Sequence, residues 1–353
     1  KAVNASSWLS ELLAIEAELN NPQSDNFAGQ VARNLRNEHA SNKAIIVGNA
    51  AMNHPQAAQI LAVANRIAQS CGAVVSVAVD GANTVGAYAV GAVAQNGSLT
   101  AQQMLAQPRA VYVTLNVEPA NDTANPAQAV AALKSAFVIA LNPYFSAVAD
   151  TADVILPTVP FTETGGTFVN AEGRAQTFNP VVKPLGEARP AWKVLRVLGE
   201  RLDIQSPAFS ANDVNDIRAA VAPVLAELPA RLANGSSAVA QAAQVADGWV
   251  RSTRVNPYAV DAVVRRAGSL QKTKWAQDGL VVGLADNVYQ ALGLAVDLAG
   301  DPEWVIVKQG ENSVKAQAVL NPKLADNVVD IQAGTALAAA LGSAYASVTV
   351  ERA

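Results

Sequence analysis

Apolar runs alternate with amphipathic stretches through the first half of the chain. The runs are rich in Val, Ile, Leu and Ala, and they occupy residues 43–48, 73–79, 110–115, 136–141 and 152–157. Helical patterns separate them, as at residues 55–71 and 125–135. Strands that are apolar along their whole length and separated by helices are typical of a parallel sheet covered on both faces. The pattern predicts a doubly wound, mostly parallel α/β sheet.

The remaining patterns divide the chain into four segments. Residues 1–40 read as a helical lead-in at the start of a fragment, and residues 41–205 hold the α/β pattern. Residues 206–275 read as an Ala-rich helical insert followed by a basic linker. Residues 276–353 alternate apolar and polar positions between turn residues, which predicts a small β-rich C-terminal domain. The sequence begins KAVNASSWLS without an initiator Met, which suggests a fragment boundary.

Composition excludes several classes of protein. Hydrophobic residues make up 51% of the chain and charged residues 15%, a balance that favours compact domains over disorder. The net charge of -4 provides no broad basic field, so nucleic acid is not expected as a partner. The apolar window 279–300 contains Asp286 and Asp297, which a membrane would have to bury at a cost of several kcal/mol, so no direct membrane span is expected.

Few residues of this chain are able to ligate a redox metal. One Cys and two His are present, and an iron-sulfur cluster is held by several thiolates. Cys71 is predicted to be a small buried hydrophobe rather than a reactive thiol. His39 is isolated, and His54 directly precedes Pro55, so helix-start packing is favoured over catalysis for His54. No metal site is expected in this fragment.

Polar side chains occupy the turns that follow the predicted strands. In a parallel sheet these turns lie at the strands' carboxyl ends, where ligands bind. They lack a neighbouring His or Lys, and capping of helices and turns is favoured over ligand contact. The residues are Asn49, Asp80, Asn83, Asn116, Glu118, Asp122 and Asn142. The spacing of Gly81, Gly86 and Gly91 does not match a dinucleotide fingerprint, and a P-loop is absent.

A β-hairpin is predicted after the last apolar run. TFVN and RAQTF alternate on either side of Ala171-Glu172-Gly173, where Gly173 supplies a positive φ. Four polar residues surround the turn, namely Glu163, Asn170, Glu172 and Arg174. Two interpretations remain open. A Glu163–Arg174 pair fixes the turn, or the hairpin contacts a nucleotide.

The run ADVILP, then PFTETGGTFVNAEGRAQTFNP, then GEARPAWKVLRVLGERL resembles the end of the α/β region of molybdopterin oxidoreductases. In the metal-bearing relatives this region lies near the pterin nucleotide. The resemblance implies a retained or relict nucleotide contact. Its candidate residues are Glu163, Gly166, Thr167, Asn170, Glu172 and Arg174. It also implies that the C-terminal domain is barrel-like.

Within that superfamily, NVEPAND, FTETGGTFVNAEGR, GEARPAWKVLRVLG and VDAVVRRAGSLQKT together resemble the C-terminal part of the large iron-sulfur subunit of bacterial NADH:quinone oxidoreductase, respiratory complex I. The resemblance runs from about residue 40 to the end. It implies a non-catalytic scaffold that supports assembly beside an electron relay from NADH through flavin and iron-sulfur clusters to quinone, coupled to proton translocation. The clusters are expected in an N-terminal part that is missing here, and molybdenum is not expected. The implied partners are other peripheral-arm subunits, on the cytoplasmic side of the bacterial inner membrane.

Two other functions remain open at this point. The chain is alternatively the C-terminal fragment of an active molybdopterin-dependent oxidoreductase, or a free-standing nucleotide-binding module. Charge patches add a further alternative. Residues 251–274 carry six basic side chains and one acid, whereas residues 278–303 carry five acids and no base. These patches are either solvated faces or sites where neighbouring subunits dock.

Overall fold

The protein is described by a computed structural model of the chain. It describes residues 1–21, 23–37, 42–95, 97–206, 209–232, 235–240, 248–276, 279–295 and 302–353. His39 and Asp297 lie outside the described residues.

The chain forms two compact units. The first unit comprises Lys1–Ala78, Ala124–Ala127 and Asn234–Ala353, and the second comprises Val79–Thr123 and Gln128–Ala233. The helical start of the chain therefore belongs to the same unit as the C-terminal domain. This grouping differs from the four segments predicted above. The segments follow local sequence patterns, whereas the units are defined by contacts between residues that are far apart in the chain.

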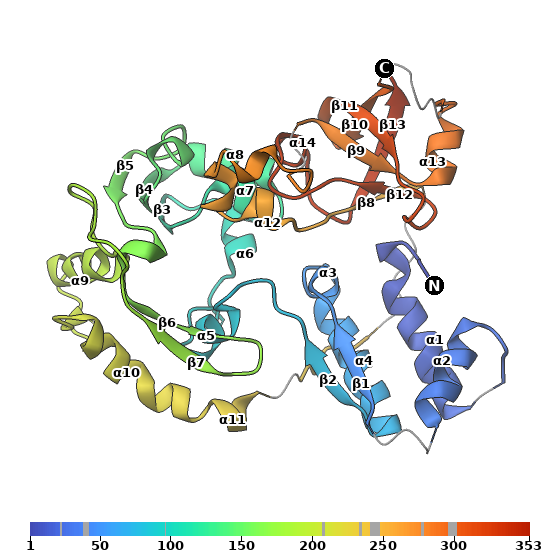
Figure 1. The fold of residues 1–353 in the computed structure, drawn as a ribbon, viewed down its shortest axis with the longest axis horizontal. Helices are drawn as coiled ribbons and strands as arrows, with labels where there is room; N and C mark the ends of the chain where they lie inside the picture. The colour runs from blue at the N-terminus through green and yellow to red at the C-terminus, as the bar shows by residue number, and fades with distance from the viewer. Residues whose placement is uncertain are drawn as a thin grey trace. The chain divides into compact units, whose positions relative to one another are not determined.

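The N-terminal part of the first unit packs helices against a pair of parallel strands (Figure 1). Its elements are η1 (Ala5–Ser7), α1 (Trp8–Asn20), α2 (Phe27–Arg36), β1 (Ala44–Val47), α3 (Asn49–Met52), α4 (Ala57–Cys71) and β2 (Val74–Val77). Apolar residues of α1 such as Leu9 and Leu19 share a buried core with Ile60 and Ile67 of α4. The helix α4 ends at Gly72, whose φ of 68° gives the left-handed cap that favours glycine.

The C-terminal part of the first unit is a closed barrel, labelled β8 to β13 in Figure 1. Its strand order is β10-β11-β9-β12-β8-β13. The strands are β8 (Trp249–Ser252), β9 (Val281–Leu284), β10 (Trp304–Gln309), β11 (Asn312–Leu320), β12 (Val328–Asp330) and β13 (Ser347–Arg352). The helical segments of this part are α12 (Pro257–Val260), η5 (Val264–Arg266), η6 (Leu270–Lys272), α13 (Asp286–Ala291) and α14 (Ala336–Ala340). Closure leaves no unpaired sheet edge.

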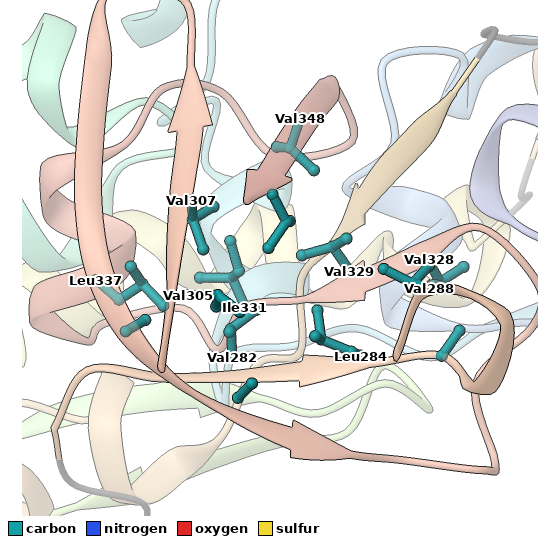
Figure 2. Close-up of a cluster of buried hydrophobic side chains, with 14 of the residues drawn as sticks. Val282, Leu284, Val288, Val305, Val307, Val328, Val329, Ile331, Leu337 and Val348 are labelled. Carbon is teal, nitrogen blue, oxygen red and sulfur yellow. The ribbon is translucent and has the colours of Figure 1, made fainter. Parts of the chain in front are cut away.

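The barrel interior is filled by aliphatic side chains, as Figure 2 shows. Along β10 the burial alternates, so Val305 and Val307 are fully buried while their neighbours are less so. Val282 and Leu284 of β9 enter the same core, as does Ile331. Because the side-chain period of a strand is two, one face of each strand supplies this core.

The second unit holds a three-stranded parallel sheet and a separate hairpin. The sheet order is β3-β4-β5, with β3 (Val111–Leu115), β4 (Phe137–Asn142) and β5 (Val154–Pro157). The hairpin pairs β6 (Gly166–Val169) with β7 (Ala175–Phe178). The helical segments are α5 (Thr84–Ala89), α6 (Ala101–Ala106), α7 (Pro119–Asp122), α8 (Pro126–Lys134, which begins in the first unit), η2 (Phe145–Ala147), η3 (Phe161–Glu163), α9 (Ala191–Arg201), α10 (Val214–Ala226) and α11 (Leu228–Arg231).

The predicted fold class is confirmed. Each predicted apolar run of the α/β pattern contains a parallel strand, and the C-terminal domain is a barrel. The parallel strands form two sheets, β1-β2 and β3-β4-β5. One barrel strand, β8, comes from within residues 206–275, the predicted helical insert and basic linker. Among the described residues, no helix has the length and apolar character needed to cross a membrane.

The basic patch predicted at residues 251–274 is broken up by the barrel. Arg251 is 2% exposed, and its guanidinium donates to the carbonyl oxygen of Gly342 at 2.7 Å and to Gln309 at 3.1 Å. Burial lowers the pKa of Arg251 to about 10. Because Arg251 is enclosed, the prediction of a continuous basic surface is wrong at this residue.

Candidate functional site

The turn of the predicted hairpin is organised by Asn170. Its side-chain oxygen accepts hydrogen bonds from the amides of Glu172, at 3.1 Å, and Arg174, at 2.9 Å. Gly173 completes the turn with a φ of 79°. The Asn170 side-chain nitrogen also donates to the Glu172 carboxylate at 3.4 Å. Three of the six predicted contact residues therefore bond within the turn itself.

The predicted Glu163–Arg174 pair is wrong. The carboxylate of Glu163 accepts a hydrogen bond from the amide of Leu185 at 3.1 Å, and neither Glu163 nor Arg174 forms an ion pair with a described residue. The chain around Leu185 returns to η3, where the amide of Val181 also donates to Thr162 at 2.8 Å. Glu163 consequently anchors the backbone at Leu185, which lies 22 residues later in the chain.

Gly166 and Thr167 serve the pairing of the hairpin strands. Thr167 lies opposite Thr177, and Gly166 lies opposite Phe178. A Cβ at Gly166 would lie 2.7 Å from the Phe178 ring, which packs against Phe168 in a tilted arrangement at a centroid distance of 4.7 Å. The glycine therefore makes room for an aromatic pair. None of the six candidate residues lines the cleft or the groove described below.

Removing the Asn170 side chain is expected to destabilise the hairpin, whereas removing the Arg174 side chain is not. Asn170→Ala leaves two backbone amides without their acceptor, so the free energy of unfolding should fall by about 1 to 2 kcal/mol. Arg174→Ala should change it by less than about 0.5 kcal/mol, since the side chain is exposed and unpaired among the described residues. Urea unfolding of both variants checks this. Equal losses would show that Arg174 has a structural role.

The polar residues at the carboxyl ends of β3, β4 and β5 bond to one another or to nearby backbone atoms. The hydroxyl of Thr158 donates to the Asn116 side chain at 3.0 Å. Asn142 accepts from the amide of Tyr144 at 2.8 Å and donates to the carbonyl oxygen of Val117 at 3.3 Å. Asn142 and Thr158 are buried. This bonding agrees with the interpretation that these residues cap turns.

A cleft of about 850 Å³ lies at the carboxyl end of β1, within the first unit. The cleft is framed by the start of α1, by α3, and by the chain that leaves β8 and continues through α12 and η6. Its lining is polar, cationic and aromatic, and consists of Trp8, Asn49, Ala50, Ser252, Thr253, Arg254, Val255, Asn256, Pro257, Tyr258, Lys274 and Trp275. Asn49, a predicted edge residue, is part of it.

The charge of the cleft lining is positive. Among the described residues, Arg254 and Lys274 are the charged residues that line it. The guanidinium of Arg254 is bonded at 2.6 Å to Asp330, whose side chain is 1% exposed. Burial raises the pKa of Asp330, and the positive charge of Arg254 opposes that rise. Lys274 lies 4.9 Å from the ring centroid of Trp275.

Sequence reasoning missed most of this cleft, because its walls come from residues that are far apart in the chain. Trp8 and Trp275 are brought together only when the barrel packs against the helical start of the chain. The sequence signal for the cleft is the mixture of basic and aromatic residues in 254–275, a range whose local pattern predicts a linker.

One side of this region is a cluster of three aromatic rings. His54 lies 5.5 Å from Trp8 and 5.2 Å from Tyr345 between ring centroids. The Nδ1 atom of His54 accepts from the amide of Gln56 at 3.1 Å, which requires that nitrogen to be unprotonated. Burial lowers the pKa of His54. His54 packs at the start of α4, in line with the helix-start interpretation.

The stability of the protein is expected to fall in mild acid through His54. Its folded pKa lies below the unfolded value of about 6.5, so its contribution is present above that pH and is lost as the pH falls through the folded pKa. In a His54→Phe variant, the decrease in unfolding free energy between about pH 7 and about pH 5 should be smaller. Urea unfolding across this range measures it. His39→Gln is the control, and a parallel effect there would contradict the assignment.

Side chains able to ligate a metal are dispersed in the part of the chain that the structure describes. Among the described residues, no group of three or more His, Cys, Asp and Glu side chains is placed to hold a metal ion. The thiol of Cys71, at the end of α4, donates a hydrogen bond to the carbonyl oxygen of Ala68 at 3.7 Å. The cleft offers cations and rings in place of metal ligands. We therefore derive no chemical step through a metal.

Comparison with known proteins identifies a family over more than half of the chain. A family model described as molybdopterin oxidoreductase matches residues 12–201. Over 74 residues the chain is 43% identical to the mitochondrial 78 kDa subunit of NADH-ubiquinone oxidoreductase from Candida albicans, covering 21% of this chain and 10% of that protein. Over 92 residues it is 34% identical to the same subunit of Neurospora crassa, covering 26% and 12%.

Two further proteins resemble parts of the chain. Over 90 residues the chain is 32% identical to a predicted formate dehydrogenase of Staphylococcus aureus, covering 26% of this chain and 9% of that protein. Among solved structures, acetylene hydratase from Pelobacter acetylenicus aligns with a TM-score of 0.45 and 16% identity, covering 64% of this chain and 37% of that chain. The aligned segments thus span about a tenth of the sequence relatives' length.

Proposed function

Because the chain belongs to the molybdopterin oxidoreductase family, we propose that it is a structural portion of the large iron-sulfur subunit of an NADH:quinone oxidoreductase. The observation that carries this proposal is the 43% identity with the 78 kDa subunit of Candida albicans. The sequence identity with the predicted formate dehydrogenase is lower, at 32%. In this role the chain supports assembly of the peripheral arm while NADH oxidation, electron transfer and proton translocation occur elsewhere.

The chemistry of the described side chains supports a non-catalytic role. At the sheet edge, the side chains of Asn116, Asn142 and Thr158 are occupied by bonds to neighbouring turns. At the hairpin, the carboxylate of Glu163 is engaged by the Leu185 amide. Groups committed in this way hold the backbone in place. They are not free to transfer protons to a substrate.

We propose that the iron-sulfur clusters of the assembly are ligated by residues outside this chain, and that the chain holds no molybdenum. A retained nucleotide contact fits the cleft better than the hairpin, because Lys274 lies beside the Trp275 ring there and Arg254 lines the same cleft. The chain would attach to other peripheral-arm subunits on the cytoplasmic side of the bacterial inner membrane.

A second candidate function is favoured by the similarity to a predicted formate dehydrogenase. In that case the chain is part of an active molybdenum oxidoreductase whose metal ligands lie in other residues of the protein. The metal with its pterin would accept the electrons of the substrate and pass them on. The residues of this chain would contribute binding and orientation through the cationic cleft.

Metal analysis of the native protein separates these two functions. The protein is purified from its own membranes with its partners, and its molybdenum and iron contents are measured together with NADH- and formate-dependent dye reduction. The scaffold role predicts iron, NADH-dependent reduction and only traces of molybdenum. Stoichiometric molybdenum with formate-dependent reduction would overturn it in favour of the second function.

A further inference from the structure

A groove of about 570 Å³ runs beside helix α9 in the second unit. Its apolar lining comes from one residue of β5, Leu156, and from Val194, Val197 and Leu198 of α9. Val197 is 44% exposed, although it lies in the middle of the helix. The opposite side of α9 is packed, since Gly199 is buried and lies against the Phe209 ring. The groove face is therefore the outward face of this helix.

Four cations line the same groove, and none of its described lining residues carries a carboxylate. They are Arg189, Lys193, Arg196 and Arg201. Arg189 lies 3.8 Å from the exposed carboxylate of Glu187. The other three form no ion pair or side-chain hydrogen bond with a described residue, and the ammonium of Lys193 lies over the Trp192 ring at 5.3 Å. Unpaired cations that surround an apolar floor indicate a surface suited to an anionic partner with apolar groups.

The spacing of these cations indicates the kind of partner. Lys193, Val197 and Arg201 are four residues apart and form one stripe, about 12 Å long at 1.5 Å per residue. Its positive charges are distributed along the helix with an exposed apolar residue between them. A single phosphate is recognised by donors that converge on one point. Distributed cations instead match carboxylates spaced along a polypeptide.

We propose that this α9 groove docks an acidic amphipathic segment of a partner protein. Its apolar side chains pack on Leu156, Val197 and Leu198, and its carboxylates face Lys193, Arg196 and Arg201. Trp192 lies at the same groove, and buried Trp and Arg residues dominate many protein interfaces. Glu200 is exposed on the same helix, does not line the groove, and forms no ion pair with a described residue. This inference goes beyond the proposed function and does not depend on it.

The test uses a synthetic peptide probe. One peptide carries Leu at helical spacing with Glu between the Leu positions, and a second carries Lys in place of Glu. Trp192 is the only tryptophan between residues 79 and 233, so a change in fluorescence that disappears in Trp192→Phe reports binding at the groove. The Glu peptide is expected to bind with a salt-dependent affinity, and the Lys peptide is not.

Two variants and a matched control decide the outcome. Lys193→Glu combined with Arg196→Glu should weaken binding of the Glu peptide by about tenfold or more, and Val197→Asp should weaken it similarly. Arg109→Glu combined with Lys134→Glu makes the same change in net charge at exposed residues outside the groove, and should leave binding unchanged. Circular dichroism confirms that each variant is folded.

Three results would overturn the proposal. Equal weakening in the control pair would mean that only net charge matters. Full displacement of the peptide by inorganic pyrophosphate would mean that the groove is a phosphate site. Self-association of the chain that is abolished by the Lys193→Glu and Arg196→Glu pair would mean that the groove is occupied by a second copy.

Discussion

Leu284→Ala is expected to lower the free energy of unfolding of the first unit by about 2 to 5 kcal/mol. Leu284 is fully buried in β9, opposite Leu320 of β11 and Val329 of β12. Figure 2 shows it inside the cluster of aliphatic side chains that fills the barrel. The closed strands around it leave little room to collapse, so the lost methyl groups would leave a cavity.

The control is a truncation to alanine at an exposed position of the same barrel. Val319 lies in the adjacent strand β11 and is 44% exposed, so Val319→Ala should cost less than about 1 kcal/mol. Urea unfolding followed by the fluorescence of Trp249 and Trp304, both in barrel strands, measures the two variants. Equal losses would contradict the idea that Leu284 sits in a closed core.

Gly199→Ala is expected to destabilise the second unit by about 1 to 3 kcal/mol, against the usual preference of helices for alanine. On propensity alone this change would stabilise α9 by roughly 0.8 to 1 kcal/mol. A Cβ at this position would lie 2.3 Å from the Cδ1 atom of Phe209. The ring would have to move, because real Cβ atoms do not approach carbon atoms so closely. The steric clash therefore outweighs the higher helix propensity of alanine, and the substitution lowers the free energy of unfolding.

A double variant tests the cause. Adding Phe209→Ala to Gly199→Ala removes the ring, so the two changes should cost less together than the sum of their separate effects. Unfolding is followed by the fluorescence of Trp192, which lies in the same helix as Gly199. An increase in stability for Gly199→Ala alone would show that the Phe209 ring is free to swing away, and would refute the close packing of this face.

Much of the fold was predictable from local patterns. The run 136–141 was expected to be a buried strand, and β4 occupies Phe137–Asn142. Gly173 was expected at a positive φ, and it has a φ of 79°. These predictions depend on a few neighbouring residues, since strand pattern and turn conformation are properties of short segments. The expected burial on both faces is wrong for β3, where Val111 and Val113 are each 53% exposed, because burial depends on which segments pack on the sheet. The family motifs around the hairpin likewise identified the molybdopterin oxidoreductase family.

The candidate site was less predictable, because its residues have distant partners. Glu163 was expected to pair with Arg174, eleven positions away by sequence number, yet its carboxylate accepts from Leu185. Arg251 was expected on a basic surface, yet the barrel encloses it with Gln309 and Gly342. Charge and proximity in sequence suggested both errors. Neither quantity specifies which segments meet after folding.

The sequence by itself determined the apolar strands, the turn glycines and the low number of possible metal ligands, because these follow from residue type and local spacing. The tertiary structure alone decided that Trp8, Arg254 and Trp275 share one cleft, and that the cations of α9 border an apolar groove. Such groupings require chain closure over long separations, and their free energy comes from packing between distant segments. In the hairpin that marks the family, Asn170 bonds within the turn, and the cleft and the groove are lined by other residues.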